Sequence, residues 1–282
     1  MATTKNTKLL GVLGNPLKHT FSPKMHSYFA QVTGLDTAYL AFEVEKDDLS
    51  GIVDGAKRMG AIGFNITSPY KIDIMSHIDV IDPEAELMGA VNTIVNRDGK
   101  WYGYNTDGDG FVNSLVAQVG DIANKKVLII GAGGSARSIA YKLAKKGVSS
   151  ISFHAKTQQK IDVIYDVISK NTDCKCFKEM DANETYDIII NTTPLGMHPY
   201  ENENPFIEHM DMINSDTVCC DLIYNPEKTL FLQLSEQRGA KIINGLPMFV
   251  LQGVYAYELF CNVKLDEKCI EGATKLLSED IN

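Results

Sequence analysis

The sequence lacks the features that mark membrane proteins, secreted proteins and nucleic-acid-binding proteins. None of its apolar runs approaches the ~20 residues that a membrane-spanning helix needs, and residues 1–10 contain no apolar run of signal-peptide length. There is no basic tract, and the net charge is −9. This balance argues against nucleic acid or an anionic membrane as a partner. We therefore expect a cytoplasmic protein.

Cysteine is present without the spacing that builds disulfide frameworks or metal sites. The six cysteines include no C-x-x-C pair and no paired His-Cys spacing. Only Cys174-Lys-Cys176 comes near a ligand pattern, and it is a weak one. We interpret the cysteines as reduced thiols, most of them in the core, and expect no metal.

What is present is an ordinary globular composition without repeats. The chain has 282 residues, of which 44% are hydrophobic and 22% are charged. This length suits one large domain or two typical ones. Strands at 8–13, 38–44 and 63–67 alternate with helices at 22–34 and 47–60, which predicts a parallel α/β sheet. Ser22 is expected to be the N-cap of the first helix, with Pro23 at its first helical position and Gly34 as its stop.

Polar residues gather where the third of these strands ends. Asn65 and Thr67 lie in the strand, Pro69 should end it, and Lys71 follows. Open α/β sheets bind ligands at the carboxyl ends of their strands, and a Lys at such a site can lend a proton. The alternative is that Lys71 is a solvated surface lysine and Asn65 a turn former.

A hairpin carries a second polar group. Residues 91–95 and 101–104 alternate as strands around Asp98-Gly99, a strong hairpin signal. Asn92, Asn105 and Asp107 flank this hairpin. Asp107 precedes an apolar-periodic segment at 111–119, so it is expected either to cap that helix or to join a site.

The clearest motif comes at the middle of the chain. A continuous apolar strand at 126–130 runs into Gly131-Ala132-Gly133-Gly134-Ser135-Ala136, followed by a helix from about 137 to 146. G-x-G-x-x-A between a strand and a helix predicts a Rossmann-type dinucleotide site, because its small residues let the backbone and the helix N-terminus approach a pyrophosphate.

The next strand, at 150–154, indicates which dinucleotide is bound. It ends in Ala155-Lys156-Thr157, where NAD-binding folds usually place an acid for the ribose 2′-OH. A positive Lys and a hydroxyl suit a 2′-phosphate, which favours NADP over NAD. Further strands at 174–177, 186–190, 217–222 and 240–243, with helices at 158–169 and 229–238, continue the alternation. A long helix carrying Gln252 and a last helix at 266–277 follow.

With these segments in place, the chain resembles the shikimate/quinate dehydrogenase family over nearly its full length. The ordered motifs are Gly14-x-Pro16 with Thr20, Ser22-Pro23 and His26; Asn65-x-Thr67-x-Pro69-x-Lys71; Gly89-Ala-Val-Asn92-Thr93; Asn105-Thr106-Asp107; Gly131-Ala-Gly-Gly134; Asn191-Thr-Thr; Asp221-x-x-Tyr224-x-Pro226; and Asn244-Gly245-Leu-x-Met248 with Gln252.

The resemblance implies a two-domain α/β enzyme. An N-terminal catalytic domain would comprise residues 1–107 and be completed by C-terminal helices from 247–282, and a Rossmann-type doubly wound NADP-binding domain would comprise 108–246. The implied reaction is the reversible NADPH-dependent reduction of 3-dehydroshikimate to shikimate, an oxidoreductase step in aromatic amino-acid (chorismate) biosynthesis. The partner would be a small molecule, and the enzyme a monomer or homodimer.

The resemblance also implies the roles of individual residues. Lys71 would act as acid/base, and Asp107 would orient it. The implied substrate-binding residues are Thr20, Ser22, Asn65, Thr67, Asn92, Tyr224 and Gln252. The implied cofactor-binding residues are Gly131, Ala132, Gly133, Gly134, Ser135, Ala136, Ala155, Lys156, Thr157, Leu222, Gly245 and Met248.

Two departures from the family pattern leave alternatives open. Thr20 stands where the family usually has Ser, which narrows the carboxylate pocket and leaves quinate open as a substrate. Lys156 stands in place of the Arg of Asn-Arg-Thr, which leaves NAD open. A methylene-folate dehydrogenase also has two domains and a lysine, but would not explain Thr20, Ser22, Asp107 and Gln252 together. A non-catalytic dinucleotide sensor would need neither Lys71 nor Asp107.

Overall fold

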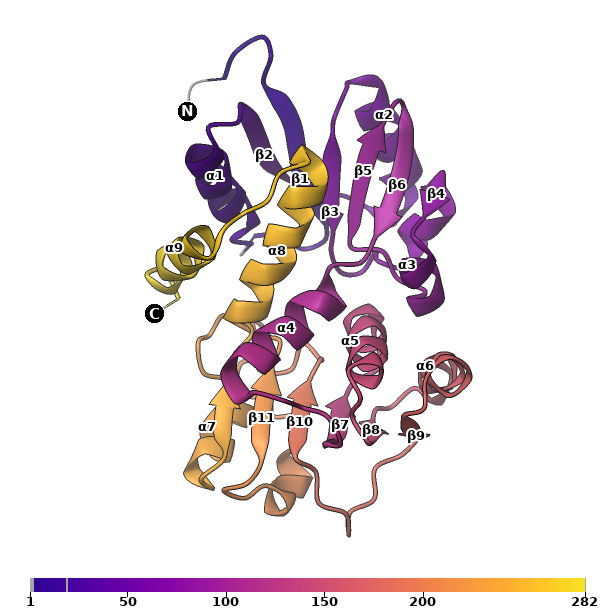
Figure 1. The fold of residues 1–282 in the computed structure, drawn as a ribbon, viewed down its shortest axis with the longest axis vertical. Helices are drawn as coiled ribbons and strands as arrows, with labels where there is room; N and C mark the ends of the chain where they lie inside the picture. Colours follow the sequence, from indigo (N-terminus) through magenta and orange to yellow (C-terminus); the bar gives the residue numbers. More distant parts are fainter. Residues whose placement is uncertain (1–2, 19, 282) are drawn as a thin grey trace. The chain divides into compact units, whose positions relative to one another are not determined.

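The computed structural model describes residues 3–18 and 20–281 and divides into two compact units, each built on its own sheet (Figure 1). The first unit holds the chain up to Asp107 together with Val250–Leu277. The second holds Gly108–Phe249 and the chain from Ser278. Strands and helices alternate in both units, which confirms the predicted α/β class. Among the described residues no helix is long and apolar enough to cross a membrane.

The first sheet is mixed. Its strands are β1 (Lys8–Gly14), β2 (Thr37–Glu43), β3 (Gly63–Ile66), β4 (Val80–Ile81), β5 (Thr93–Arg97) and β6 (Lys100–Tyr104), in the order β2-β1-β3-β5-β6-β4. β1 pairs in parallel with β2 and β3, and β5 pairs antiparallel with β3 and β6. Asp98 and Gly99 have positive φ at the hairpin turn, as the Asp-Gly pair predicts.

The first unit also contains all or most of five α-helices within its described residues. They are α1 (Ser22–Thr33), α2 (Leu49–Arg58), α3 (Pro83–Met88), most of α8 (Leu246–Cys261) and most of α9 (Glu267–Ser278). Phe64 and Ile66 of β3 join the core under α2 and α3. The alternate residues Gly63 and Asn65 face the other side, where a Cβ on Gly63 would meet Phe260 of α8 at 2.2 Å. This alternation places Asn65 on the face that α1 and α8 cover.

The expectation that Ser22 is the N-cap of α1 is wrong. The helix already includes Ser22, and Phe21 stands at the cap position without a side-chain capping bond. The physical reason is a local hydroxyl pair: the Ser22 N–H donates to Thr20 Oγ1 at 3.3 Å, and the Thr20 hydroxyl donates to Ser22 Oγ at 3.2 Å. Ser22 is therefore held by Thr20 instead of capping the helix. Gly34 ends α1 in the left-handed conformation, as predicted.

The second sheet is fully parallel. Its strands are β7 (Lys126–Ile130), β8 (Ser150–His154), β9 (Lys175–Phe177), β10 (Ile188–Asn191), β11 (Val218–Asp221) and β12 (Lys241–Ile243), in the order β12-β11-β10-β7-β8-β9. This is the doubly wound order in which the chain reverses direction next to the first strand, here between β7 and β10. Its helices are α4 (Asp107–Val119), α5 (Gly134–Lys145), α6 (Gln158–Asn171) and α7 (Leu230–Gln237).

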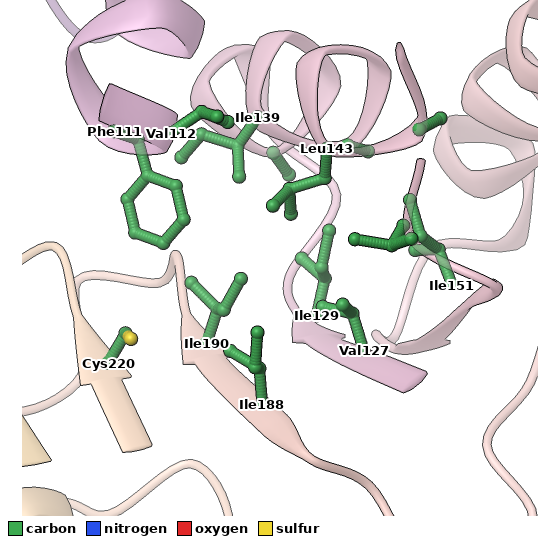
Figure 2. Close-up of a cluster of buried hydrophobic side chains, with 14 of the residues drawn as sticks. Phe111, Val112, Val127, Ile129, Ile139, Leu143, Ile151, Ile188, Ile190 and Cys220 are labelled. Carbon is green, nitrogen blue, oxygen red and sulfur yellow. The ribbon is translucent and has the colours of Figure 1, made fainter. Parts of the chain in front are cut away.

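Strand residues of the second unit alternate between two apolar layers. Val127 and Ile129 of β7 pack with residues of α4, α5 and α6, whereas Leu128 and Ile130 pack toward α7 and the short helix Ile207–Met212. Figure 2 shows Phe111 of α4 and Ile139 and Leu143 of α5 above the strand residues of the first layer. A strand buried on both faces needs apolar residues at every position, which explains the continuous run at 126–130.

Helix α5 begins earlier than the sequence predicted. It starts at Gly134 and not near Arg137, with Gly133 in extended backbone as its N-cap and no side-chain cap. Small residues at the first turn allow this start, because Ala136 lies on the buried face of the helix and is fully buried. The helix N-terminus therefore lies directly after the strand end at Ile130.

Candidate active site and dinucleotide site

Lys71 and Asp107 form a shielded ion pair in the first unit. Lys71 Nζ lies 2.5 Å from Asp107 Oδ2, and the side chains are 16% and 5% exposed. Lys71 follows the end of β3, and Asp107 is the first residue of α4. The Asp107 N–H donates to Asn105 Oδ1 at 3.1 Å, so the Asn105 side chain binds the first N–H of α4. The Asp107 carboxylate is thereby left to hold Lys71.

Asn92 fixes the other oxygen of Asp107. Its Nδ2 donates to Asp107 Oδ1 at 2.8 Å and to Thr106 Oγ1 at 2.9 Å. Its Oδ1 accepts from the Thr106 N–H at 2.8 Å and from the Thr93 hydroxyl at 2.9 Å. Every polar atom of the Asn92 side chain therefore has a protein partner, and the residue is 2% exposed. Asn92 can thus act on a substrate by orienting Asp107.

Asn65 lies next to this group on β3. Its Nδ2 donates to Thr93 Oγ1 at 3.2 Å, and its Oδ1 accepts from the Tyr39 hydroxyl at 2.8 Å. Thr67 is half-buried just beyond the strand end, and its N–H donates to Leu13 O. Thr93, Thr106 and Tyr39 were not among the predicted site residues. Tyr39 occupies an apolar strand position, so its sequence context indicates a core residue.

The other predicted substrate residues lie on separate elements. Thr20 and Ser22 form the hydroxyl pair at the start of α1. Gln252 is half-buried on the part of α8 that belongs to the first unit. Tyr224 belongs to the second unit, where its ring and that of Phe249 have centroids 4.5 Å apart. The structure thus joins Lys71, Asp107 and Asn92 directly and describes Tyr224 with the second unit.

The glycine-rich turn of the second unit offers room for a ligand. Gly131 has φ of +105°, which favours glycine, and follows β7 directly. A Cβ on Gly133 would meet nothing within 4 Å. The uncapped N-terminus of α5 presents its amides at the same turn. Open space beside a helix N-terminus suits the diphosphate of a dinucleotide.

Two further groups of predicted cofactor residues take defined places in the second unit. Ala155, Lys156 and Thr157 follow β8, with Lys156 and Thr157 exposed. Leu222 and Gly245 lie against each other, because a Cβ on Gly245 would meet Leu222 O at 2.0 Å. Met248 is 8% exposed and packs into the larger apolar core. The close approach of Leu222 O means that only glycine fits at position 245.

Asp221 forms a buried network at the end of β11. Its carboxylate accepts from Asn191 Nδ2, from the Thr229 hydroxyl at 2.7 Å and from the Ile223 N–H at 3.0 Å. Burial raises the pKa of Asp221 from 3.8 to about 7, although these donated hydrogen bonds lower it. The network ties the ends of β10 and β11 to the N-cap of α7.

Comparison with known proteins assigns the chain to a family. The model of the shikimate dehydrogenase substrate binding domain matches residues 12–94, and that of shikimate / quinate 5-dehydrogenase matches residues 114–221. The chain belongs to the shikimate dehydrogenase family. The resemblance inferred from the ordered motifs is thereby confirmed. Within the described residues, no group of three or more His, Cys, Asp or Glu side chains could hold a metal ion.

Relatives in this family match the chain over almost its whole length. The shikimate dehydrogenase (NADP+) of Methanococcus aeolicus is 41% identical over 271 residues, which cover 95% of this chain and 96% of the relative. A shikimate dehydrogenase crystallised in complex with NADP+ is 37% identical with a TM-score of 0.90, covering 100% and 98% of the two chains. The Listeria monocytogenes shikimate 5-dehydrogenase, in complex with shikimate and NAD, is 33% identical with a TM-score of 0.88 and 98% coverage of both chains.

Proposed function

We propose that this protein is an NADP-dependent oxidoreductase that interconverts 3-dehydroshikimate and shikimate, a step of aromatic amino-acid biosynthesis. The carrying observation is the Lys71–Asp107 pair, held by Asn92 in a chain of the shikimate dehydrogenase family. We assign substrate binding to residues 1–107 with 247–282 and cofactor binding to 108–246.

In this proposal Lys71 donates the proton in one direction of the reaction and accepts it in the other. NADPH, when bound, supplies the hydride that adds to the carbonyl carbon. The carbonyl oxygen then gains negative charge, and the Lys71 ammonium stabilises that charge and donates a proton to it. In the reverse direction, neutral Lys71 accepts the proton of the substrate hydroxyl. Asp107 Oδ2 keeps Nζ in place in both directions.

The substrate is held by hydrogen bonds from side chains of several elements. We assign the carboxylate of the substrate to the hydroxyls of Thr20 and Ser22, and its ring hydroxyls to Asn65, Thr67, Asp107, Tyr224 and Gln252. A small polyhydroxylated acid needs this many partners, because each buried polar group left unpaired costs about 1–3 kcal/mol. Asn92 supports this set by orienting Asp107.

The cofactor is held by the turn after β7 and by the end of β8. The residues there fit a dinucleotide: the space beside Gly133 is open, and the first turn of α5 is uncapped. We assign the 2′-phosphate to Lys156 and Thr157, which are exposed after β8. Leu222, Gly245 and Met248 would lie near the nicotinamide.

Crossed activity assays test this proposal. The absorbance of reduced nicotinamide is followed with purified protein, combining shikimate or quinate with NADP+ or NAD+. Fast reduction with shikimate and NADP+ alone is the expected result. Comparable rates with quinate or NAD+ would move the protein to a quinate/shikimate dehydrogenase that uses NAD. No turnover in any combination, with dinucleotide still bound, would make it a sensor.

The assembly and location belong to the same proposal. We expect a cytoplasmic monomer or homodimer that binds no nucleic acid. Size-exclusion chromatography with light scattering measures the mass against 31.1 kDa for one chain. A larger closed assembly would contradict this part of the proposal and leave the proposed reaction unaffected.

A further inference from the structure

Tyr39 is a buried polar residue that the reaction does not explain. It lies on β2 and is 5% exposed, and its hydroxyl donates to Asn65 Oδ1 on β3 at 2.8 Å. β1 separates these strands, with Leu10 opposite Tyr39 and Val12 opposite Asn65. The tyrosine therefore spans the intervening strand to reach the amide. A buried tyrosine usually finds a partner for its hydroxyl, but here the partner is a proposed substrate residue.

The Tyr39 oxygen also has a neighbour on α1. The Ser22 side chain favours the ionised phenol, which partly offsets the burial that raises the pKa of Tyr39 well above 10.0. The single hydroxyl proton of Tyr39 is donated to Asn65. Ser22 Oγ accepts in turn from Thr20 at 3.2 Å. The Tyr39 hydroxyl thus binds Asn65 and has Ser22 of the proposed carboxylate-binding pair as a neighbour.

From Asn65 the same chain of donors continues to the catalytic pair. Asn65 Nδ2 donates to Thr93 Oγ1 at 3.2 Å, and the Thr93 hydroxyl donates to Asn92 Oδ1 at 2.9 Å. Asn92 Nδ2 donates to Asp107 Oδ1 at 2.8 Å, and Asp107 Oδ2 holds Lys71. Every bond from Tyr39 to Asp107 therefore points in the same direction, and the chain ends on a carboxylate. Hydrogen bonds in such a chain polarise and strengthen one another.

His26 holds the Tyr39 ring from α1. The two rings are stacked, with centroids 4.0 Å apart and 6° between their planes. Neither ring nitrogen of His26 has a hydrogen-bond partner in the described part of the chain. Phe29, Tyr257 and Phe260 surround the same imidazole. His26 therefore contacts Tyr39 through its ring face, which restricts the tilt of the phenol.

We propose that Tyr39 is a positioning residue for the substrate site, whose hydroxyl fixes the Asn65 side chain before the substrate binds. The inference rests on the proposed function. It adds a residue that touches no reacting atom and acts through Asn65, one of the proposed substrate residues. Pre-organised partners raise affinity because less ordering remains to be done on binding.

The test compares Tyr39→Phe with Tyr257→Phe. Tyr257 is a matched control, because it belongs to the same aromatic group and its buried hydroxyl is hydrogen-bonded to Thr33 Oγ1 at 3.1 Å, outside the chain of donors. We expect Tyr39→Phe to raise the KM for shikimate about tenfold, the effect of one or two lost hydrogen bonds. Its kcat should change less than threefold, and its KM for NADP+ less than twofold. Tyr257→Phe should leave all three within twofold.

A double-mutant cycle separates positioning from general packing. If Tyr39 acts through Asn65, Tyr39→Phe should raise KM at most twofold in an Asn65→Ala background. An undiminished tenfold effect in that background would overturn the proposal, as would a wild-type KM in Tyr39→Phe or an equal rise in Tyr257→Phe. Wild-type turnover of shikimate with NADP+ is measured first, so failure of the proposed function is seen separately.

An isosteric variant keeps the test decisive if Tyr39→Phe does not fold. Thr93→Val retains the shape of a fully buried side chain and removes the hydroxyl between Asn65 and Asn92. It should raise the KM for shikimate at least threefold and lower kcat by a similar factor, because it cuts the chain next to Asp107. Folded Thr93→Val with wild-type constants would contradict the proposed chain.

Discussion

Lys71 Nζ and Asp107 Oδ2 lie 2.5 Å apart, although the residues are 36 positions apart in the sequence. Both side chains are largely buried, and Asn92 occupies the second carboxylate oxygen. A buried charge without its partner is costly, typically about 3–5 kcal/mol. The two side chains therefore stabilise each other, and in the proposed function the Lys71 ammonium faces the substrate.

Replacing Lys71 should abolish most activity and also lower stability. Lys71→Met removes the proton donor and leaves the Asp107 charge unpaired. We expect kcat to fall about 10²- to 10⁴-fold, the usual value of general acid–base catalysis, and the free energy of unfolding to fall by roughly 3 kcal/mol. Steady-state kinetics and urea unfolding measure the two effects.

The double variant Lys71→Met with Asp107→Asn separates these effects. Removing both charges should recover much of the lost stability and none of the activity. Lys57→Ala is the control, since Lys57 makes a partly exposed ion pair with Asp79 in the same unit. A Lys71→Met enzyme within a few-fold of wild-type kcat would show that the catalytic assignment is wrong.

Lys156 should discriminate between the two dinucleotides. Lys156→Ala removes the positive charge assigned to the 2′-phosphate, so we expect the Kd for NADP+ to rise about tenfold, the result of losing one exposed charge-assisted contact. The Kd for NAD+ should stay within twofold. Cofactor fluorescence titration of both ligands gives the comparison, with Lys170→Ala of α6 as the control for net charge. Equal weakening for both ligands would remove the proposed role.

Gly133 should be required by the cofactor and not by the fold. Its φ of −79° is open to any residue, and a Cβ there would meet nothing within 4 Å. Gly133→Ala should therefore keep the melting temperature within about 2 °C of wild type. The added methyl would occupy the space where the pyrophosphate approaches, so NADP+ affinity should fall at least about tenfold.

Gly51→Ala is the matched control for Gly133→Ala. Its Cβ also meets nothing, on helix α2 of the first unit. Both variants should fold, and only Gly133→Ala should lose NADP+ affinity. Unchanged NADP+ binding by Gly133→Ala would mean that the dinucleotide lies elsewhere.

Local patterns in the sequence predicted much of this architecture. The apolar run at 126–130 and the glycines after it predicted a strand, a turn and a helix, because a doubly covered strand and a tight turn each require particular residues. The Asp98-Gly99 hairpin followed from turn chemistry. The Thr20–Ser22 pairing could not be predicted in this way, since a cap and a hydroxyl pair use the same residues.

The hydrogen bonds that hold the candidate site were harder to predict from the sequence than the site residues themselves. Asn92 and Asp107 were recognised as polar groups beside a hairpin, but the saturation of Asn92 by Thr93 and Thr106 depends on strand register. Tyr39 meets Asn65 across an intervening strand, and that meeting depends on sheet order. Sheet order is a long-range property that residue periodicity does not encode.

The last prediction concerns pH and the buried carboxylate of Asp221. Burial raises its pKa to about 7 from 3.8. Between these two pH values the folded state therefore still binds a proton that the unfolded state has already lost. The contribution of Asp221 to stability is therefore fully present below about pH 4 and falls as the pH rises to about 7. The fall between pH 5 and 7 is at most about 3 kcal/mol, from two pH units at roughly 1.4 kcal/mol each.

Asp221→Asn should remove this dependence. Urea unfolding measures the free energy of unfolding of both proteins. The wild-type value minus the Asp221→Asn value should fall from pH 5 to pH 7 and stay constant above that. Asp121→Asn makes the same charge change at an exposed position, so it reports the effect of net charge. A difference that grows with pH would mean that the bonds from Asn191, Thr229 and the Ile223 N–H outweigh burial, because those donors favour the ionised carboxylate.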